Sequence, residues 1–179
     1  LAGGGFVLGE TSEEQNKNPQ PPIYQSPIHI CVSVDGMRAY VVNQTSASIS
    51  ILDVRSRKVT GEIPVGSFPS HAALSPDGRI LFVTSHYESS VQIVDLEENR
   101  VSRSVRTGYG PYGVTVSSDG ERIYVANALS NTVSFISVIS GETLAEIPVG
   151  REPRYIVEAP DGRRLIVGNG LSRNVSIVD

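Results

Sequence analysis

The stretch SSDGERIYVANALSNTVSFI, residues 117–136, contains the pattern that decides the fold. An Asp-Gly turn is followed by the apolar run 123–126, a polar connection, and a second apolar run, 133–136. Two short apolar runs joined by turn residues predict adjacent antiparallel strands. The same turn returns every 42 residues, at Asp35-Gly36, Asp77-Gly78, Asp119-Gly120 and Asp161-Gly162.

Prolines and valines keep the same period, at Pro27, Pro69, Pro111 and Pro153 and at Val41, Val83, Val125 and Val167. A period of this size with short β-like segments is typical of a repeat architecture. Each unit holds four apolar runs, and that spacing predicts an antiparallel meander. In the second unit the predicted strands are 71–75, 79–85, 91–96 and 100–107.

The second and third strands of each unit are apolar on both faces, as in Tyr124-Val125-Ala126. An antiparallel sheet with one face in water should alternate apolar and polar residues. Continuous apolar runs therefore indicate that both faces are covered, as when small sheets stack face to face around an axis. The sequence predicts an all-β fold, a β-propeller in which each unit is one four-stranded blade.

The units 27–68, 69–110 and 111–152 are complete, whereas 153–179 holds only three strands. We favour a fragment of a larger propeller of about seven blades, with a closed four-bladed ring as the alternative. Residues 1–22 are expected to form a flexible N-terminal linker ahead of the propeller region 23–179, because 10–22 is polar and rich in proline. The apolar segment 1–9 is either the tail of a signal sequence or the start of a fragment.

Bulk composition excludes some function classes. The chain is 39% hydrophobic and 19% charged with a net charge of −4, and no segment is basic enough to predict nucleic-acid binding. No stretch approaches the about 18 consecutive apolar residues that a membrane span needs. Cys31 is the single cysteine, so an internal disulfide is excluded.

The motifs Ser-Pro-Asp-Gly at 75–78, Ile-Tyr-Val-Ala-Asn at 123–127, Asn-Thr-Val-Ser at 131–134 and Ile-Pro-Val-Gly at 147–150 recur at equivalent positions. Together they resemble the YVTN-type β-propeller repeat, and the resemblance covers residues 27–179. TolB-like and lactonase-type propellers share parts of the pattern, but the strict period without insertions favours the YVTN type. The absence of tryptophan argues against WD40 blades.

The resemblance implies an extracytoplasmic protein (periplasmic, cell-surface or secreted), often seven-bladed and mostly of unassigned activity. Some relatives are the propeller parts of redox enzymes that carry c-type haem. That role needs a Cys-x-x-Cys-His segment, which these 179 residues lack, so we expect no cofactor in this chain.

In a propeller the first strand of each blade lines the central channel, and the B–C and D–A loops share one rim, where binding sites are expected. Three histidines map there, and they form a candidate zinc or copper site: His29, His71 and His86. The alternative is that each imidazole only makes local hydrogen bonds.

Tyrosine and arginine also gather on this rim, and both residue types are favoured at recognition surfaces. The candidate binding residues are Tyr87, Tyr109, Tyr112, Arg151, Arg154 and Tyr155. The alternative is a solvated loop face with scattered tyrosines.

Three further residue types have structural interpretations. Glu158 stands where the other units have apolar residues, so we expect it to be exposed on a terminal face, or else paired with a base such as Arg154. Recurring aspartates are expected to cap the C–D turn, with calcium binding as the alternative: Asp53, Asp95 and Asp179. Recurring asparagines at the end of the second strand are expected to be turn residues: Asn43, Asn127 and Asn169.

The sequence therefore predicts a non-enzymatic, extracytoplasmic scaffold whose rim binds a protein or another macromolecule. Further blades are expected from the rest of the chain or from another copy. The alternative is enzymatic: the propeller portion of an oxidoreductase whose haem or metal lies outside this segment, or a lactonase-like hydrolase. No residue is assigned a catalytic role, since no nucleophile stands at a recognisable spacing from a base.

Overall fold

The computed structural model describes residues 25–179, and every regular element in that range is a strand. Blade one contains β1 (Pro27–Val32), β2 (Arg38–Asn43), β3 (Ser48–Asp53) and β4 (Lys58–Pro64). Blade two contains β5 (Pro69–Leu74), β6 (Ile80–Ser85), β7 (Ser90–Asp95) and β8 (Arg100–Arg106). Blade three contains β9 (Pro111–Val116), β10 (Arg122–Asn127), β11 (Thr132–Ser137) and β12 (Thr143–Pro148). Blade four contains β13 (Pro153–Glu158), β14 (Leu165–Asn169) and β15 (Asn174–Val178).

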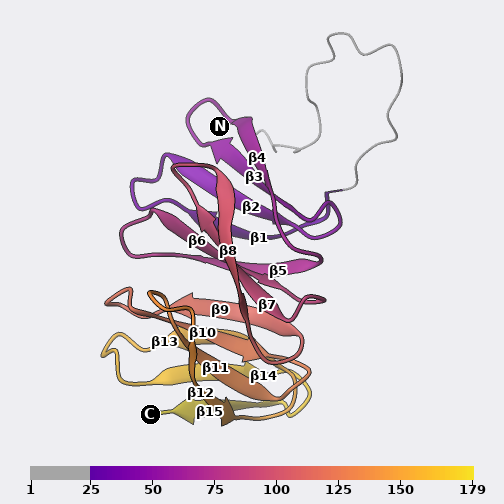
Figure 1. Ribbon diagram of the computed structural model, residues 1–179, viewed down its shortest axis with the longest axis vertical. Coiled ribbons are helices and arrows are strands. Elements are labelled where there is room, and N and C mark those ends of the chain that lie inside the picture. Colours follow the sequence, from indigo (N-terminus) through magenta and orange to yellow (C-terminus); the bar gives the residue numbers. More distant parts are fainter. Residues whose placement is uncertain (1–24) are drawn as a thin grey trace, which may run out of the picture.

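Each blade is a separate antiparallel sheet whose strands pair in chain order. Figure 1 shows the four sheets stacked face to face in chain order, from indigo at one end to yellow at the other. The predicted fold class is confirmed: three four-stranded blades are followed by three strands of a fourth. Among the described residues no helix is long and apolar enough to cross a membrane.

The hydrophobic core lies between the blades and consists of three clusters, one for each pair of neighbours. Phe82 of β6 is fully buried against blade three, while the next residue, Val83, is fully buried against blade one. Adjacent strand residues point to opposite faces of a sheet, so an internal blade needs apolar residues at both. This explains the continuous apolar runs in the sequence.

The outer faces of the first and last blades are open. Ile30 of β1 is 56% exposed, whereas its equivalent Ala72 in blade two is 2% exposed. Val175 of β15 is 61% exposed, whereas its equivalent Val133 in blade three is completely buried. Blades one and four therefore do not cover each other, and the closed four-bladed ring considered from the sequence is wrong. The described blades form an arc.

The residue types in the turns explain the hydrogen bonds and backbone conformation seen there. In the A–B turn of blade two Ser75 Oγ donates to Asp77 at 2.6 Å, and Gly78 has a φ of 72°, in the region that favours glycine. Asp95 accepts hydrogen bonds from the backbone N–H groups of Glu97 and Glu98 in the C–D turn. Asp53 caps the same turn in blade one, so the predicted capping role is confirmed for both aspartates.

The sequence predicted that Glu158 is exposed on a terminal face or else pairs with Arg154, and both predictions are wrong. It is half-buried between blades three and four, where its carboxylate accepts a hydrogen bond of 2.8 Å from the backbone N–H of Ser118. The residue thus ties β13 to the A–B turn of blade three. The predicted linker, residues 1–22, lies outside the described residues.

Candidate binding rim

The B–C and D–A loops of each blade pair with each other through backbone hydrogen bonds and form one rim, as the sequence predicted. In blade three Leu129 N–H donates to Tyr109 C=O at 3.1 Å, and in blade four Leu171 N–H donates to Arg151 C=O at 3.2 Å. These bonds hold the loop backbones in place, so the rim side chains project from a defined support.

A buried polar cluster lies directly beneath the rim, and it shows that the prediction for the recurring asparagines is wrong. Asn127 is completely buried, and its Nδ2 donates to Ser134 Oγ at 2.8 Å and to Thr132 Oγ1 at 3.1 Å. Thr132 Oγ1 in turn donates to Glu146. Asn127, Asn43 and Asn169 therefore join the second strand to the third by side-chain bonds, and they are not turn residues.

The same cluster explains a glycine of the repeat. Gly108 lies against Asn127, and a Cβ placed there would come within 2.7 Å of the amide nitrogen. The backbone N–H of Gly108 also donates to Ser134 Oγ at 3.4 Å. The D–A loop can approach this closely only where the residue has no side chain.

Blade two builds the cluster with different residues. Ser85 takes the place of the asparagine, and Gln92 replaces the serine of the third strand. Gln92 Nε2 donates to Ser104 Oγ at 3.2 Å and to Glu88 Oε2 at 3.1 Å. In blade two the amide is therefore on the third strand and not on the second, and a carboxylate, that of Glu88, again accepts a hydrogen bond from the cluster.

The D–A loop of blade two carries an unusual backbone conformation. Phe68 has a φ of 54°, in the left-handed region that bulky residues rarely adopt. The equivalent positions are also left-handed: Ser26 at 48°, Gly110 at 62° and Glu152 at 54°. The conformation thus belongs to the repeat, and its cost at the bulky Phe68 must be compensated by the surrounding contacts.

Phe68 supports an aromatic cluster on the rim. Its ring stacks on Tyr87, with ring centroids 4.5 Å apart, and Tyr87 is 70% exposed. The His86 ring meets the edge of Tyr87 at 5.6 Å, and His86 Nδ1 is buried without a hydrogen-bond partner. The cluster presents Tyr87 to solvent on a rigid base.

Large apolar side chains continue along the rim beyond this cluster. Tyr109 is 73% exposed, Leu129 67% and Leu171 59%. Leu129 lies over Gly110, where an added Cβ would come within 2.5 Å of Leu129 Cγ. Neither leucine was predicted from the sequence; the available signal was their repeat position, which is that of Tyr87.

The structure brings two of the three predicted histidines together. The rings of His29 and His71 are 3.6 Å apart between centroids, where the first strands of blades one and two are irregular in register. His29 Nδ1 accepts a hydrogen bond from Ala72 N–H at 3.3 Å, and Cys31 Sγ donates to Ala72 C=O at 3.1 Å. These contacts join β1 to β5.

Burial shifts the pKa values of His29, His71 and Cys31. It lowers the pKa of His71 to about 4, with a further contribution from charge on His29, and it lowers the pKa of His29 as well. Burial raises the pKa of the Cys31 thiol to about 11. His71 Nδ1 has no hydrogen-bond partner. Both imidazoles are therefore neutral near pH 7.

His86 does not join this pair. Within residues 25–179 no group of three His, Cys, Asp or Glu side chains is arranged to hold a metal ion. His86 instead lies in the aromatic cluster with Phe68 and Tyr87.

Three of the predicted residues, Tyr112, Arg154 and Tyr155, form a second group on β9 and β13. Arg154 forms an ion pair with Glu152, and its guanidinium lies 5.6 Å from the centre of the Tyr112 ring. Tyr112 and Tyr155 meet edge to face at 6.2 Å. The hydrogen bond from Arg154 to Glu152 raises the pKa of the guanidinium, which stays charged.

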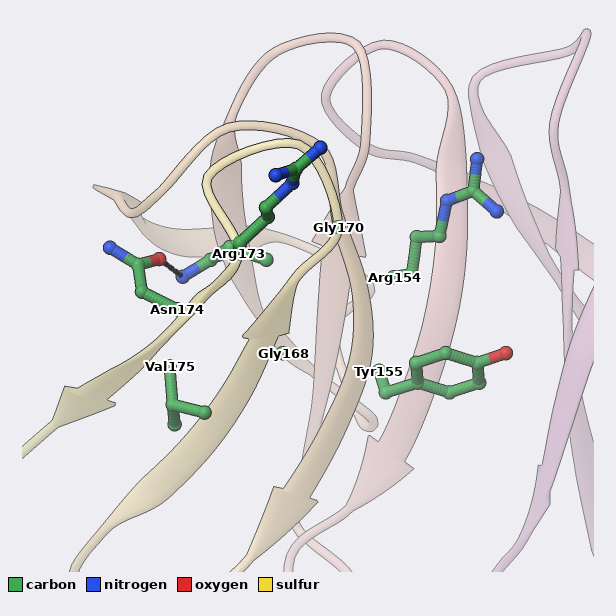
Figure 2. Close-up of a pocket in the computed structure, with 8 residues that line it drawn as sticks. Arg154, Tyr155, Gly168, Gly170, Arg173, Asn174 and Val175 are labelled. Atoms are coloured by element: carbon green, nitrogen blue, oxygen red, sulfur yellow. Dashed lines mark hydrogen bonds between the residues drawn. The ribbon is translucent and has the colours of Figure 1, made fainter.

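A shallow hollow of about 330 Å³ adjoins this group, between Arg154 and Arg173 and over Gly168 and Gly170. Figure 2 shows the two guanidinium groups on either side of the loop at Gly170. At the equivalent place between blades three and four, Glu152 N–H donates to Asn131 Oδ1 at 2.8 Å, so chain fills that space. The hollow therefore corresponds to the space that the loop with Glu152 occupies between blades three and four.

Comparisons with known proteins were consistent with this architecture. The family described as "Lactonase, 7-bladed beta-propeller" matches residues 61–179, about two thirds of the chain. Hydrazine synthase subunit beta of Kuenenia stuttgartiensis is 34% identical over 65 residues, which are 36% of this chain and 16% of that protein. The chain therefore spans a small part of that curated relative.

Solved structures extend the likeness across the blades. A chain of Kuenenia stuttgartiensis hydrazine synthase matches with a TM-score of 0.82 and 29% identity, over 94% of this chain and 49% of that chain. A functionally unknown protein from Desulfotomaculum acetoxidans matches with a TM-score of 0.72 and 19% identity, over 86% and 55% of the two chains, which shows the fold alone. On the family match, this chain belongs to the lactonase family of seven-bladed β-propellers.

Proposed function

We propose that this chain is a non-enzymatic, extracytoplasmic propeller module of the YVTN repeat type that binds a protein partner through its B–C and D–A rim. The observation that carries the proposal is the exposed apolar ridge of Tyr87, Tyr109, Leu129 and Leu171 on hydrogen-bonded loops. Exposed apolar clusters of this kind mark interaction sites in soluble proteins. A relative named as a subunit of hydrazine synthase supports a role inside an assembly.

Site-specific photo-crosslinking tests the proposal. A photoreactive phenylalanine analogue replaces Tyr87 on the rim or, as a matched control, Ile139, which is 82% exposed in a C–D loop at the opposite end of the blades. We expect irradiation of source cells to give one discrete protein adduct at position 87 and none at 139. Absence of an adduct at 87, or the same adducts at both positions, would contradict a partner on this rim.

The open faces of blades one and four are proposed to bind further blades, from the rest of the protein or from another copy. The family is seven-bladed, and the apolar side chains there are buried wherever a neighbouring blade is present. Sedimentation of the isolated chain tests this. Self-association that is lost in Val175→Ser is expected, and a monomer at all concentrations with unchanged behaviour in the variant would argue against it.

The second candidate is enzymatic, either the propeller portion of an oxidoreductase or a lactonase-like hydrolase. The stacked pair of neutral imidazoles, His29 and His71, favours it, since neutral imidazole is the common form for metal binding. Elemental analysis of the purified protein separates the candidates. Stoichiometric zinc, copper or calcium that is lost in His71→Gln would favour the enzyme over the scaffold.

A further inference from the structure

We propose that the rim of blades two to four binds one continuous segment of a partner protein, in a fixed direction. Apolar side chains of the segment would contact Tyr87, Leu129 and Leu171, and its acidic residues would lie over Arg151. This inference rests on the proposed function and adds the chemistry of the partner.

Beside Tyr109, the ridge has one apolar residue from the B–C loop of each of three consecutive blades. Tyr87, Leu129 and Leu171 occupy the same repeat position in the B–C loop, and 59–70% of each is exposed. Blade one has exposed Thr45 at this position, so the fold itself does not need an apolar residue there. The hydrophobic side chains in the other three blades thus have no evident role in folding, and burying them against a partner would be favourable.

The ridge residues or their loops contact other parts of the chain before any partner binds. Tyr87 stacks on Phe68, Leu129 rests on Gly110, and the loops carrying Leu129 and Leu171 are bonded to the neighbouring D–A loops. Side chains that are already ordered lose little conformational entropy on binding, which favours affinity. Aromatic and aliphatic anchors at the centre of an interface carry most of the binding energy.

The charges along the rim are unequal and give the segment a direction. Arg151 of blade four is exposed and forms no ion pair with a described residue, whereas the charge of Arg154 is paired with Glu152. Blade two carries Glu88 at its rim, where the carboxylate accepts from Ser67 N–H at 2.7 Å. Acidic residues are therefore attracted at blade four and repelled at blade two.

A peptide is favoured over single-stranded nucleic acid as the occupant. Bases bind on aromatic platforms lined by basic residues, but two of the four ridge residues are leucines and Glu88 stands at one end. An apolar segment with acidic residues at one end matches both the hydrophobicity and the charge. Nucleic acid is kept as an outcome of the test.

In the test, peptides that bind the purified chain are selected from a random library. The affinity of individual selected peptides is then measured by fluorescence anisotropy. The probes are one selected fluorescein-labelled peptide, the same peptide with its acidic residues changed to lysine, and a labelled oligothymidylate. The proteins are the wild type, Leu129→Ser, Leu171→Ser, Arg151→Glu, and Ile139→Ser as the control. Circular dichroism shows that each variant is folded.

We expect selected peptides rich in apolar residues with Asp or Glu at one end. Each leucine variant should weaken binding about tenfold, as expected for truncation of an interface anchor. The arginine variant should weaken the acidic peptide about tenfold and bind the lysine version more tightly, while Ile139→Ser changes neither by more than about twofold.

Two kinds of result would overturn the inference, and they differ in what they say of the proposed function. If the selected peptides need Leu129 but bind equally well after the charge changes, the rim still binds protein, but the acidic character of the partner segment is refuted. Selected peptides that bind Leu129→Ser and Leu171→Ser as tightly as the wild type, no selected peptides at all, or tighter binding of the oligothymidylate would also refute the protein-binding rim itself.

Discussion

The stacked histidines between blades one and two should make the stability of this protein depend on pH in a way that one substitution removes. The pKa of His71 falls from an ordinary 6.5 to about 4, first because the ring is buried and second because His29 lies against it. Above pH 6.5 the imidazole is neutral in both the folded and the unfolded chain. Below pH 6.5 the unfolded chain takes up a proton that the folded chain excludes until about pH 4.

The size of the effect follows from that interval. Where only the unfolded state is protonated, the free energy of unfolding falls by about 1.4 kcal/mol per pH unit. From pH 6.5 to about pH 4 the loss amounts to about 3 kcal/mol, and a compact denatured state makes it smaller. The stabilisation is complete above pH 6.5 and is lost as the pH falls through this window.

Urea unfolding followed by far-ultraviolet circular dichroism, at several pH values between about 7 and about 4.5, measures the effect. His71→Gln keeps a neutral polar side chain but cannot titrate, so its free energy of unfolding should fall less steeply with acid than that of the wild type. Carboxylates titrate in both proteins and cancel in the comparison. His29→Gln leaves the burial of His71 in place, so that variant should keep most of the wild-type slope. Parallel pH profiles for the wild type and His71→Gln would refute the reasoning.

Three other predictions concern the scaffold. Gly108→Ala should reduce the free energy of unfolding by about 1–3 kcal/mol, since its Cβ would press on Asn127, whereas Gly61→Ala, with its nearest contact at 3.5 Å, should change it little; urea titration of both variants decides. Cys31 should react with an aromatic disulfide at about pH 8 about 100-fold more slowly than a free thiol, because burial raises its pKa to about 11, and a rate like that of free cysteine would contradict this. In blade two, Ser85→Asn and Gln92→Ser should each destabilise by about 1–3 kcal/mol, but the double variant, which restores the arrangement of blade three, should lose less than the sum; strict additivity of the measured free energies would disprove the coupling.

Much of the fold could be predicted from the sequence, because its signals are local and repeated. The Asp-Gly turn needs a left-handed glycine, and the apolar runs on both faces need a neighbour on each side. Both requirements can be recognised in the sequence of a single blade, and the same pattern recurs in all four units. The pairing of B–C with D–A loops then follows from the order of the strands alone.

The details of the rim were less accessible, since they depend on contacts between residues that the sequence does not place. Phe68 adopts a left-handed φ although nothing in its residue type predicts one. Asn127 has a residue type common in turns, and only its burial beneath Gly108 distinguishes a strand-bridging amide from a turn residue. His29 and His71 share a repeat position, but their contact also requires the irregular register at the start of the first strands.

The places where the four units agree and disagree support the proposed position of the binding surface. Positions that hold the blades together keep their chemistry from unit to unit: the turn glycine has a positive φ in all four, and even blade two, which lacks the asparagine, rebuilds the buried amide cluster with Gln92. The rim position of Tyr87 is different, because it holds threonine, tyrosine, leucine and leucine in turn on loops of the same backbone pairing. A unit that only had to fold would need no such variation at an exposed position. A surface that differs from blade to blade on an unchanging support is what recognition of an asymmetric partner requires, so the rim, and not the uniform blade interior, is where specificity can be encoded.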